Sequence, residues 1–552
     1  MATRDEIIAA LTAPGQPFEI HPELVSGHEV DVFAHRQHRL VELLQASARF
    51  GDGEYLVSAA QRFTYTEHLE RVAALAAGLR EEYGVGPGDR VAICAANCPD
   101  WVVTFWATVS LGAVVVGMNS MWAPAEIAHG LELTRPTVVV ADAARRTLAE
   151  SFEGSAAALA GTPVIDIDTD LPALVERHRG AVLPDVPVDE DDPAVVLFTS
   201  GTSGRPKGAT HTHRNVIAAV WFHLLNDAVA AEMGMPQSGR RFLLVTPLFH
   251  IAGLHNLCVT RLAIGDTAVV HLGKFDIEEV LRLVERERVT NWGAVPTMIS
   301  RLVERAETKG MDDVDISSLR TLSINSAPSS AALKERLRVV LPHVGRSLGT
   351  TYGLTESSSA ATLASAAELV EDPETVGRAV PTMQIEVRDP QGNAVAAGVE
   401  GEICLRGPLV MSGYWNNPEA TAGSIDDHGW FATGDLGSLT AEGHLRIASR
   451  RSDLILRGAE NIYPAEVEHQ LTGHADVDEC IVIGVPDADF GQAVAAIVVL
   501  REGATAGEEE LTDYLRPRLA RYKLPTRWIL SSDPLPRNAT GKVNRMELPA
   551  FS

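Results

Sequence analysis

Short apolar runs alternate with longer amphipathic stretches along most of the chain from about residue 60. Arg90-Val-Ala-Ile-Cys94 is one such run, and others lie at 137–141, 194–198 and 242–245. A continuous apolar run is typical of a strand buried on both faces of a parallel sheet, and the amphipathic stretch after it is typical of the helix that covers the sheet. The alternation predicts an α/β fold built from layered subdomains.

The pattern changes twice toward the C-terminus. Residues 384–388 and 401–406 alternate apolar and polar positions between glycine turns, which predicts a small antiparallel or β-barrel-like piece. Further along, 477–485 and 493–500 resemble strands, and 508–519 resembles a helix that is broken near its end by a proline. These last elements predict a small α+β domain.

The length of the chain also requires more than one core. A chain of 552 residues exceeds what a single hydrophobic core usually supports. The last change of pattern follows Ser449-Arg-Arg-Ser-Asp453. We therefore expect a large N-terminal domain at 1–451 and a small C-terminal domain at 452–552.

One uncharged stretch, 101–125, is long enough to cross a membrane. Gly112 divides it into a helix-like part at 101–111 and a β-branched run at 113–117. A buried helix followed by a buried parallel strand explains this division better than a membrane span does. We therefore expect no transmembrane segment here.

Composition narrows the possible partners. The sequence has 47 basic and 73 acidic residues, a formal net charge of −26, which argues against binding to nucleic acid or to an anionic membrane. Five cysteines at scattered positions do not suggest a disulfide framework, and the first residues lack the apolar core of a secretion signal. We expect a cytoplasmic protein.

The most informative segment runs from Phe198 to Gly208 and reads Phe-Thr-Ser-Gly-Thr-Ser-Gly-Arg-Pro-Lys-Gly. Its glycines let backbone N–H groups approach an anion, its hydroxyl groups add donors, and Lys207 adds a mobile positive charge. It is not a Walker A loop, because Lys207 follows a proline and precedes a glycine. The residues expected to hold a polyphosphate are Thr199, Ser200, Gly201, Thr202, Ser203, Gly204 and Lys207.

This loop, extended to His213, resembles the phosphate loop of the adenylate-forming superfamily, which includes acyl-CoA synthetases, peptide-synthetase adenylation domains and luciferases. Motifs of the superfamily follow in order from about Phe63 to Arg545. The resemblance implies an AMP-forming acyl-CoA synthetase that uses ATP, Mg²⁺ and CoA. The alternative is a free-standing enzyme that loads an acyl group onto a carrier protein.

The resemblance also implies which residues contact the nucleotide. Tyr352 offers a flat face to adenine, Thr355 reaches the α-phosphate and Glu356 supplies an oxygen ligand for Mg²⁺. Asp435 has two acceptor oxygens that suit the ribose diol, and Arg450 matches a second ribose contact. Two further ATP-binding positions are Ala327 and Pro328.

The same resemblance outlines the acyl pocket. His250 matches a residue beside the carboxylate, in a catalytic or gating role, and Gly349 matches the pocket wall. Asn325 and Thr351 stand where relatives usually have glycine. These two residues predict a pocket that is narrowed or polar and suited to a ring-bearing acid. An equally good explanation is neutral divergence among relatives, with the space for the acyl group supplied by other residues. Fatty, aryl and alicyclic or steroid-derived acids remain open.

Three sites in the C-terminal part complete the prediction. Lys542 matches the lysine that catalyses adenylation, while Gly458 and Ala459 match the CoA tunnel. Ser452 occupies the hinge position, where relatives usually have Asp or Lys. The sequence does not determine how this serine changes the free energy of domain rotation. The resemblance implies that the C-terminal domain moves between two half-reactions, and it makes a homodimer plausible.

Overall fold

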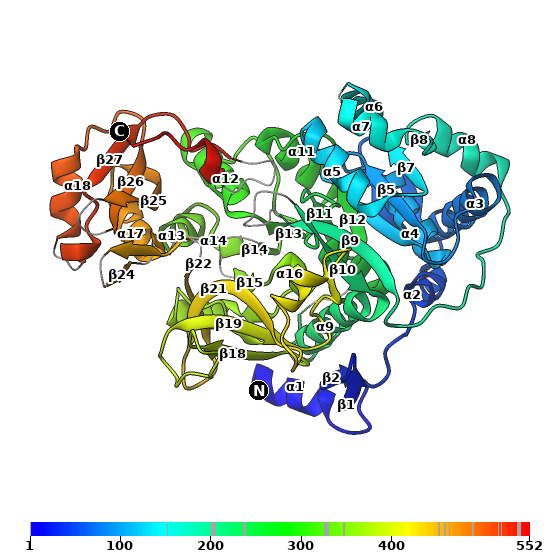
Figure 1. Ribbon diagram of the computed structural model, residues 1–552, viewed down its shortest axis with the longest axis horizontal. Coiled ribbons are helices and arrows are strands. Elements are labelled where there is room, and N and C mark those ends of the chain that lie inside the picture. The colour runs from blue at the N-terminus through cyan, green and yellow to red at the C-terminus, as the bar shows by residue number, and fades with distance from the viewer. Residues whose placement is uncertain are drawn as a thin grey trace.

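The computed structural model describes residues 2–151, 153–199, 206–235, 239–324, 331–345, 348–450, 453–457, 460–462, 464–487, 491–516, 518–519, 521–537 and 543–551. Two large mixed sheets with helices packed around them form most of the molecule (Figure 1). The C-terminal strands lie at one end of the long axis, and the seven-stranded sheet lies at the other end (Figure 1). The predicted α/β architecture, with a large N-terminal domain and a small C-terminal domain, is confirmed.

The seven-stranded sheet has the order β20-β10-β9-β6-β5-β7-β8. Its parallel strands are β5 (Arg90–Cys94), β6 (Val114–Gly117), β7 (Val138–Ala141), β8 (Val164–Asp166) and β9 (Pro193–Thr199). At one edge, β10 (Lys207–Thr212) and β20 (Gly413–Tyr414) continue the sheet in antiparallel pairing. The strands predicted at 90–94, 137–141 and 194–198 are therefore confirmed.

The nine-stranded sheet has the order β17-β16-β15-β14-β13-β11-β12-β3-β4. Its parallel strands are β3 (Glu54–Val57), β11 (Arg241–Leu244), β12 (Thr267–Val270), β13 (Asn291–Ala294), β14 (Thr321–Ile324) and β15 (Gly349–Tyr352). Antiparallel strands at its edges are β4 (Arg62–Thr64), β16 (Thr362–Ala364) and β17 (Arg378–Ala379). The strand predicted at 242–245 is confirmed as β11, one residue earlier.

Helices connect these strands, and their ends follow the capping signals of the sequence. For α3 (Tyr65–Tyr83), Thr64 and Glu67 form a capping box at the start, and Gly84 ends the helix at a φ of 69°. The other helices before residue 265 are α1 (Arg4–Thr12), α2 (Leu40–Ser47), α4 (Pro99–Ser110), α5 (Pro124–Thr134), α6 (Ala143–Glu150), α7 (Glu153–Leu159), α8 (Asp170–Arg177), α9 (His213–Glu232) and α10 (Thr260–Ile264). Those that follow are α11 (Ile277–Glu287), α12 (Pro296–Lys309), α13 (Ala331–Val340), α14 (Pro342–Gly345), α15 (Ala366–Glu371) and α16 (Pro418–Ala422).

The uncharged stretch forms α4 and then β6, as predicted. Every residue of both elements is buried, and Gly112 turns the chain between them at a φ of 66°. Among the described residues, no helix combines the length and the apolar character that a membrane crossing requires.

The antiparallel piece is a four-stranded sheet of β18 (Gln384–Arg388), β19 (Gly401–Arg406), β21 (Phe431–Leu439) and β22 (Leu445–Arg450). An N-terminal hairpin, β1 (Ile20–Val25) with β2 (His28–Phe33), stands apart from the larger sheets. The strands predicted at 384–388 and 401–406 pair directly with each other.

The C-terminal domain has its own sheet and core. Its elements are β23 (Ile455–Arg457), β24 (Glu460–Ile462), α17 (Pro464–Thr472), β25 (Val477–Asp487), β26 (Gly491–Leu500), α18 (Glu508–Leu515) and β27 (Arg527–Ser531). A cluster of buried side chains, from Ile455 to Leu524, lies wholly within this part of the chain. The helix predicted at 508–519 ends earlier, at Leu515, and the predicted boundary after residue 451 lies outside the described residues.

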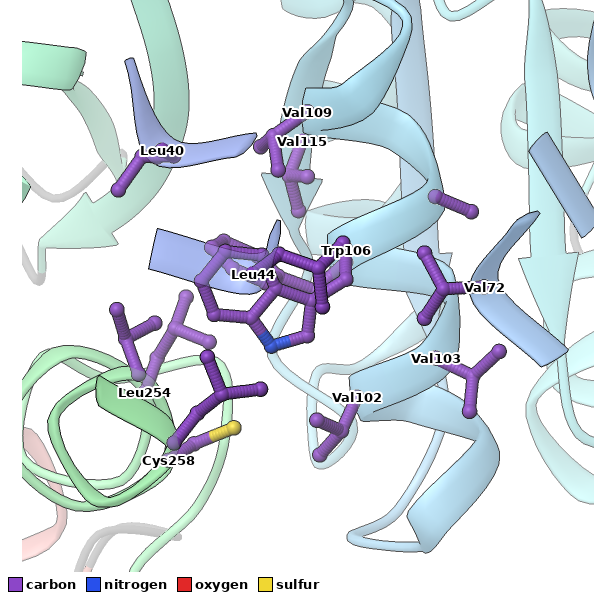
Figure 2. Close-up of a cluster of buried hydrophobic side chains, with 14 of the residues drawn as sticks. Leu40, Leu44, Val72, Val102, Val103, Trp106, Val109, Val115, Leu254 and Cys258 are labelled. Carbon is purple, nitrogen blue, oxygen red and sulfur yellow. The ribbon is translucent and has the colours of Figure 1, made fainter. Parts of the chain in front are cut away.

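The main core gathers side chains from segments that are far apart in the sequence. Leu44 of α2, Trp106 of α4 and Leu254 of a π-helix, η2 (Leu254–Val259), belong to one buried cluster (Figure 2). These three side chains are each less than 1% exposed. The cluster therefore holds the π-helix, which follows the His250 motif, against the helices of the seven-stranded sheet.

Several histidines are buried within this body. Burial lowers the pKa of His68 to about 3 and the pKa of His213 to about 4. The backbone N–H of Leu40 donates to His213 Nδ1 over 3.2 Å, so this nitrogen must be unprotonated. The folded protein thus keeps neutral imidazoles that the unfolded chain would protonate near pH 6.5.

We expect Leu44→Ala to lower the free energy of unfolding by about 2–5 kcal/mol, because the cluster cannot close fully over the space left behind. Leu24→Ala is the matched control, since Leu24 is 73% exposed and should change stability by less than about 0.5 kcal/mol. Urea unfolding followed by circular dichroism measures both. Equal losses in the two variants would contradict the burial described here.

We also expect stability to fall as the pH drops from about 6.5 toward 4. In this window the unfolded chain binds protons that the folded His213 does not, so the free energy of unfolding decreases by about 2 kcal/mol for this residue at pH 5. His213→Asn should therefore flatten the pH dependence of urea unfolding between pH 7.5 and 5. His35→Asn, at a half-exposed side chain, is the control and should leave the slope unchanged. An unchanged slope in His213→Asn would contradict the prediction.

Candidate active site

The predicted phosphate loop joins β9 to β10. Thr199, the last residue of β9, faces Lys207, the first residue of β10, in antiparallel register. The loop therefore opens at the carboxyl end of a parallel strand, where α/β sheets commonly bind ligands. Ser200, Gly201, Thr202, Ser203 and Gly204 lie outside the described residues, so their phosphate contacts stay predictions.

Tyr414 links the cation of this loop to the predicted metal ligand. The Lys207 ammonium lies 4.9 Å from the centre of the Tyr414 ring, and the Tyr414 hydroxyl donates to Glu356 Oε1 over 2.9 Å. Burial and the nearby Glu356 carboxylate raise the pKa of Tyr414, so its hydroxyl stays protonated and continues to donate. Lys207 and Glu356, found separately in the sequence, thus share one neighbour.

The sequence interpretation missed Tyr414. It lies in Met411-Ser-Gly-Tyr414, after the strand predicted at 401–406, and no spacing there indicates a ligand site. Backbone pairing places it, because Trp415 N donates to Gly208 O over 2.7 Å and Ser412 N donates to Thr210 O over 3.0 Å. The one available signal was an aromatic residue beside glycine in an otherwise irregular segment.

A second pair of predicted residues meets between two sheets. The Tyr352 hydroxyl, at the end of β15, donates to Asp435 Oδ2 in β21 over 2.8 Å. Both side chains are buried, and Asp435 faces Arg450 of β22 in antiparallel register. The structure therefore brings together the residues assigned to adenine and ribose.

The remaining described residues of this group lie close in the chain. Thr355 and Glu356 begin a short 3₁₀ helix, η3 (Thr355–Ser357), which is separated from Tyr352 by Gly353 and Leu354. Met411 N donates to the Glu356 carbonyl over 2.8 Å and fixes this turn against the segment before β20. Gly349 and Thr351 lie on β15, upstream of the turn.

His250 lies in a separate loop that leads into the π-helix. Its backbone N–H donates to Pro247 O over 3.1 Å, and its ring lies 4.6 Å from the ring of Phe249. Gly253 closes this loop, because a Cβ atom there would lie 2.3 Å from Pro247 O. The His250 carbonyl also accepts from Leu254 N, the first residue of the π-helix, over 2.9 Å. The role of His250 beside the carboxylate stays a prediction.

The other predicted site residues lie outside the described part of the chain. They are Asn325, Ala327, Pro328, Ser452, Gly458, Ala459 and Lys542. Described neighbours flank three of these residues: Arg457 pairs with Glu460 on either side of Gly458 and Ala459, and Arg537 pairs with Val543 on either side of Lys542. The adenylation lysine, the CoA tunnel and the hinge therefore remain predictions from sequence.

The side chains near Glu356 suit a metal ion that is bound by the protein and by a substrate together. Among the described residues, no group of three or more histidine, cysteine or carboxylate side chains could hold a metal alone. Glu356 offers one carboxylate, whose Oε1 already accepts from Tyr414. Mg²⁺ at nucleotide sites usually takes one or two protein carboxylates and completes its shell with phosphate oxygens and water. A single carboxylate at Glu356 is sufficient for that mode of binding.

Family models and curated relatives match most of the chain. The AMP-binding enzyme family model covers residues 43–415, and the AMP-binding enzyme C-terminal domain model covers residues 466–542. A feruloyl-CoA synthase from an Amycolatopsis species is 38% identical over 88% of this chain and 93% of its own length. A long-chain-fatty-acid–CoA ligase of Mycobacterium tuberculosis is 32% identical over 87% of this chain and 92% of its own length.

Solved structures agree with the sequence relatives. The o-succinylbenzoate CoA synthetase of Bacillus subtilis, in complex with an acyl-adenylate intermediate, superposes with a TM-score of 0.78 at 30% identity, over 92% of this chain and 98% of that protein. The resemblance seen in the phosphate loop and in the later motifs is thereby confirmed. The chain belongs to the family of AMP-binding, adenylate-forming enzymes.

Proposed function

We propose that the chain is an ATP-dependent acid–CoA ligase and that its acid carries an aromatic ring. The observation that carries this proposal is the 38% identity to feruloyl-CoA synthase across 93% of that enzyme. A ligase of this class forms an acyl adenylate with release of pyrophosphate, and then an acyl-CoA thioester with release of AMP. The described site holds side chains suited to the nucleotide part of that chemistry.

In the first half-reaction, a carboxylate oxygen attacks the α-phosphorus of ATP, and the bond to pyrophosphate breaks. Lys207 and the loop at 199–204 would neutralise the departing phosphates, and Lys542 would bridge the carboxylate and phosphate oxygens. Mg²⁺, held by Glu356 together with the phosphates, would offset further negative charge. The protein positions the reactants and stabilises charge, and it contributes no covalent intermediate.

The nucleoside would be held between the two sheets. The Tyr352 ring offers a face for adenine, while Asp435 and Arg450 would bind the ribose hydroxyls. The hydrogen bond between Tyr352 and Asp435 holds both side chains in one orientation. This preorganisation lowers the ordering cost of binding.

In the second half-reaction, the CoA thiol attacks the acyl carbonyl, and AMP leaves with the electrons of the acyl–phosphate bond. Rotation of the C-terminal domain about Ser452 would withdraw Lys542 and bring Gly458 and Ala459 to the thiol path. The separate core of the C-terminal domain supports such a movement, because that domain can turn without disturbing the packing of the larger one.

Two further observations support an aryl acid as the substrate. Besides feruloyl-CoA synthase, an indoleacetate–CoA ligase of Aromatoleum aromaticum is 33% identical over 92% of its length. Within this chain, Thr351 places a β-branched, polar side chain on β15, where the resemblance expects glycine. A wall of that kind suits a flat ring with polar substituents better than a flexible alkyl chain.

A carrier protein as acyl acceptor, a homodimer and a cytoplasmic location remain predictions from the sequence. The CoA-ligase relatives favour CoA over a carrier protein. All five cysteines are free thiols, which is compatible with a reducing compartment.

The proposal predicts that ferulate, indoleacetate and related aryl acids give AMP and a thioester with ATP, Mg²⁺ and CoA. The ratio kcat/KM for the best aryl acid should exceed that for a long-chain fatty acid by at least about ten-fold. Product formation measured by coupled AMP release and by mass spectrometry tests this. A preference for fatty acids would contradict the aryl assignment, and adenylate that CoA cannot discharge would contradict the CoA assignment.

The assignment of Lys542 predicts that Lys542→Ala reduces adenylate formation by about 10²–10³-fold. Thioester formation from supplied acyl adenylate should remain near the parent rate, because the lysine acts only in the first step. Lys274→Ala is a matched control, since Lys274 also follows a glycine but is exposed and lies outside the site. Equal loss of both half-reactions in Lys542→Ala would disprove its assigned role.

A further inference from the structure

Three buried serines follow Glu356 directly. Ser357, Ser358 and Ser359 each have no exposed surface. Ser358 has a φ of 54° and a ψ of −29°, a left-handed conformation that residues other than glycine adopt rarely. Because this conformation is unfavourable for serine, its surroundings must hold it there.

Two histidines from distant segments supply that restraint. His211 Nδ1 lies 2.7 Å from Ser358 Oγ, and His255 Nδ1 lies 2.9 Å from the Ser358 carbonyl oxygen. The two rings meet edge to face, with their centres 5.1 Å apart and their planes at 88°. His211 belongs to β10 and His255 belongs to the π-helix, and both are fully buried.

The chemistry of these contacts fixes the state of His255. A carbonyl oxygen only accepts, so His255 must carry its proton on Nδ1 and donate it. Burial lowers the pKa of His255 to about 4, and burial together with His255 lowers the pKa of His211 far below its ordinary value. Both rings therefore stay neutral, which suits a fixed hydrogen-bonding role and not proton transfer.

Each histidine lies on an element that carries part of the site. His211 is four residues beyond Lys207 on β10, the strand that also pairs with the segment bearing Tyr414. His255 is five residues beyond His250. The Ser358 N–H donates to Thr355 O over 3.1 Å, so Ser358 also closes the turn that presents Thr355 and Glu356.

The π-helix strengthens this interpretation. A π-helix is rare, and short π-helical turns are frequently found at functional sites. Here Asn256, next to His255, accepts a hydrogen bond from Ser359 Oγ over 2.6 Å. The π-helix thus contacts two of the three serines, through two consecutive side chains.

We propose that His211 and His255 are positioning residues that hold Ser358 in its left-handed conformation and thereby set Thr355 and Glu356 in place relative to Lys207. The inference rests on the proposed function, because it takes Thr355 and Glu356 to face the phosphates and the metal of ATP. Neither histidine is expected to touch the substrate. They act on the site indirectly, because they fix the turn that carries Thr355 and Glu356. We call His211, His255 and Ser358 the clamp.

The test compares the affinity for MgATP with the affinity for adenosine, both measured by isothermal titration calorimetry on the full chain. Adenosine has no phosphates, so it reports on Tyr352 and Asp435 and not on the clamped turn. His255→Phe keeps a ring of similar size and removes the donor, and we expect about ten-fold weaker binding of MgATP with unchanged binding of adenosine. His255→Asn, whose amide N–H can replace Nδ1–H, should restore most of the affinity.

A second variant, Ser358→Ala, keeps the test decisive if His255→Phe does not fold. Ser358→Ala removes only the oxygen that meets His211, and we expect about five-fold weaker MgATP binding, again with adenosine unchanged. His68→Phe is the matched control, because His68 is a fully buried histidine of α3 that packs against Tyr55, away from the serines. It should leave the ratio of the two affinities at the parent value.

The outcomes separate the two proposals. Unchanged MgATP affinity in both clamp variants, or parallel losses of MgATP and adenosine, would overturn the positioning role and leave the proposed function intact. Failure of the parent protein to bind MgATP would overturn the proposed function and this inference with it. A selective loss of MgATP affinity that His255→Asn reverses supports the clamp.

Discussion

The site depends on the pairing of β10 along both of its edges. On one edge β10 pairs with β9, which sets Thr199 opposite Lys207, and on the other edge it pairs with the short β20. These backbone hydrogen bonds leave little freedom of register, because a slip of one residue would turn every side chain to the opposite face. The phosphate loop, Tyr414 and, through His211, the serine turn all take their positions from this one strand.

In the proposed mechanism the nucleotide contacts come from the N-terminal domain, where Tyr352 belongs to a buried cluster with Ile403 and Leu405, whereas Lys542 is expected to act from the C-terminal domain, which has a core of its own. This division matches the chemistry of the two half-reactions. Nucleotide contacts must persist through both steps, so they suit a fixed framework. A lysine needed in one step only suits a part that can leave.

Most of the fold was predictable, because a buried strand such as 90–94 needs an apolar run whatever surrounds it. Tyr352, Glu356 and Asp435 could be predicted as site residues because each lies in a short motif. Tyr414 and Ser358 were missed, since their partners lie 58 and 147 residues away in the chain, at Glu356 and His211. No local pattern encodes such a pairing, which arises only when β10, β20 and the π-helix are assembled.

The hydrogen bond between Tyr352 and Asp435 has a consequence for turnover. Asp435 Oδ2 accepts a hydrogen bond from the Tyr352 hydroxyl. A ribose hydroxyl bound there, as proposed, would compete for or share an acceptor that is already in use. Such binding would exchange one hydrogen bond for another, and the net gain in binding free energy would be smaller than a carboxylate without a donor would give. When AMP leaves, the Tyr352 hydroxyl would again donate to Asp435. The buried carboxylate would then keep a hydrogen-bond donor, and product release would avoid the penalty of an unpaired buried charge.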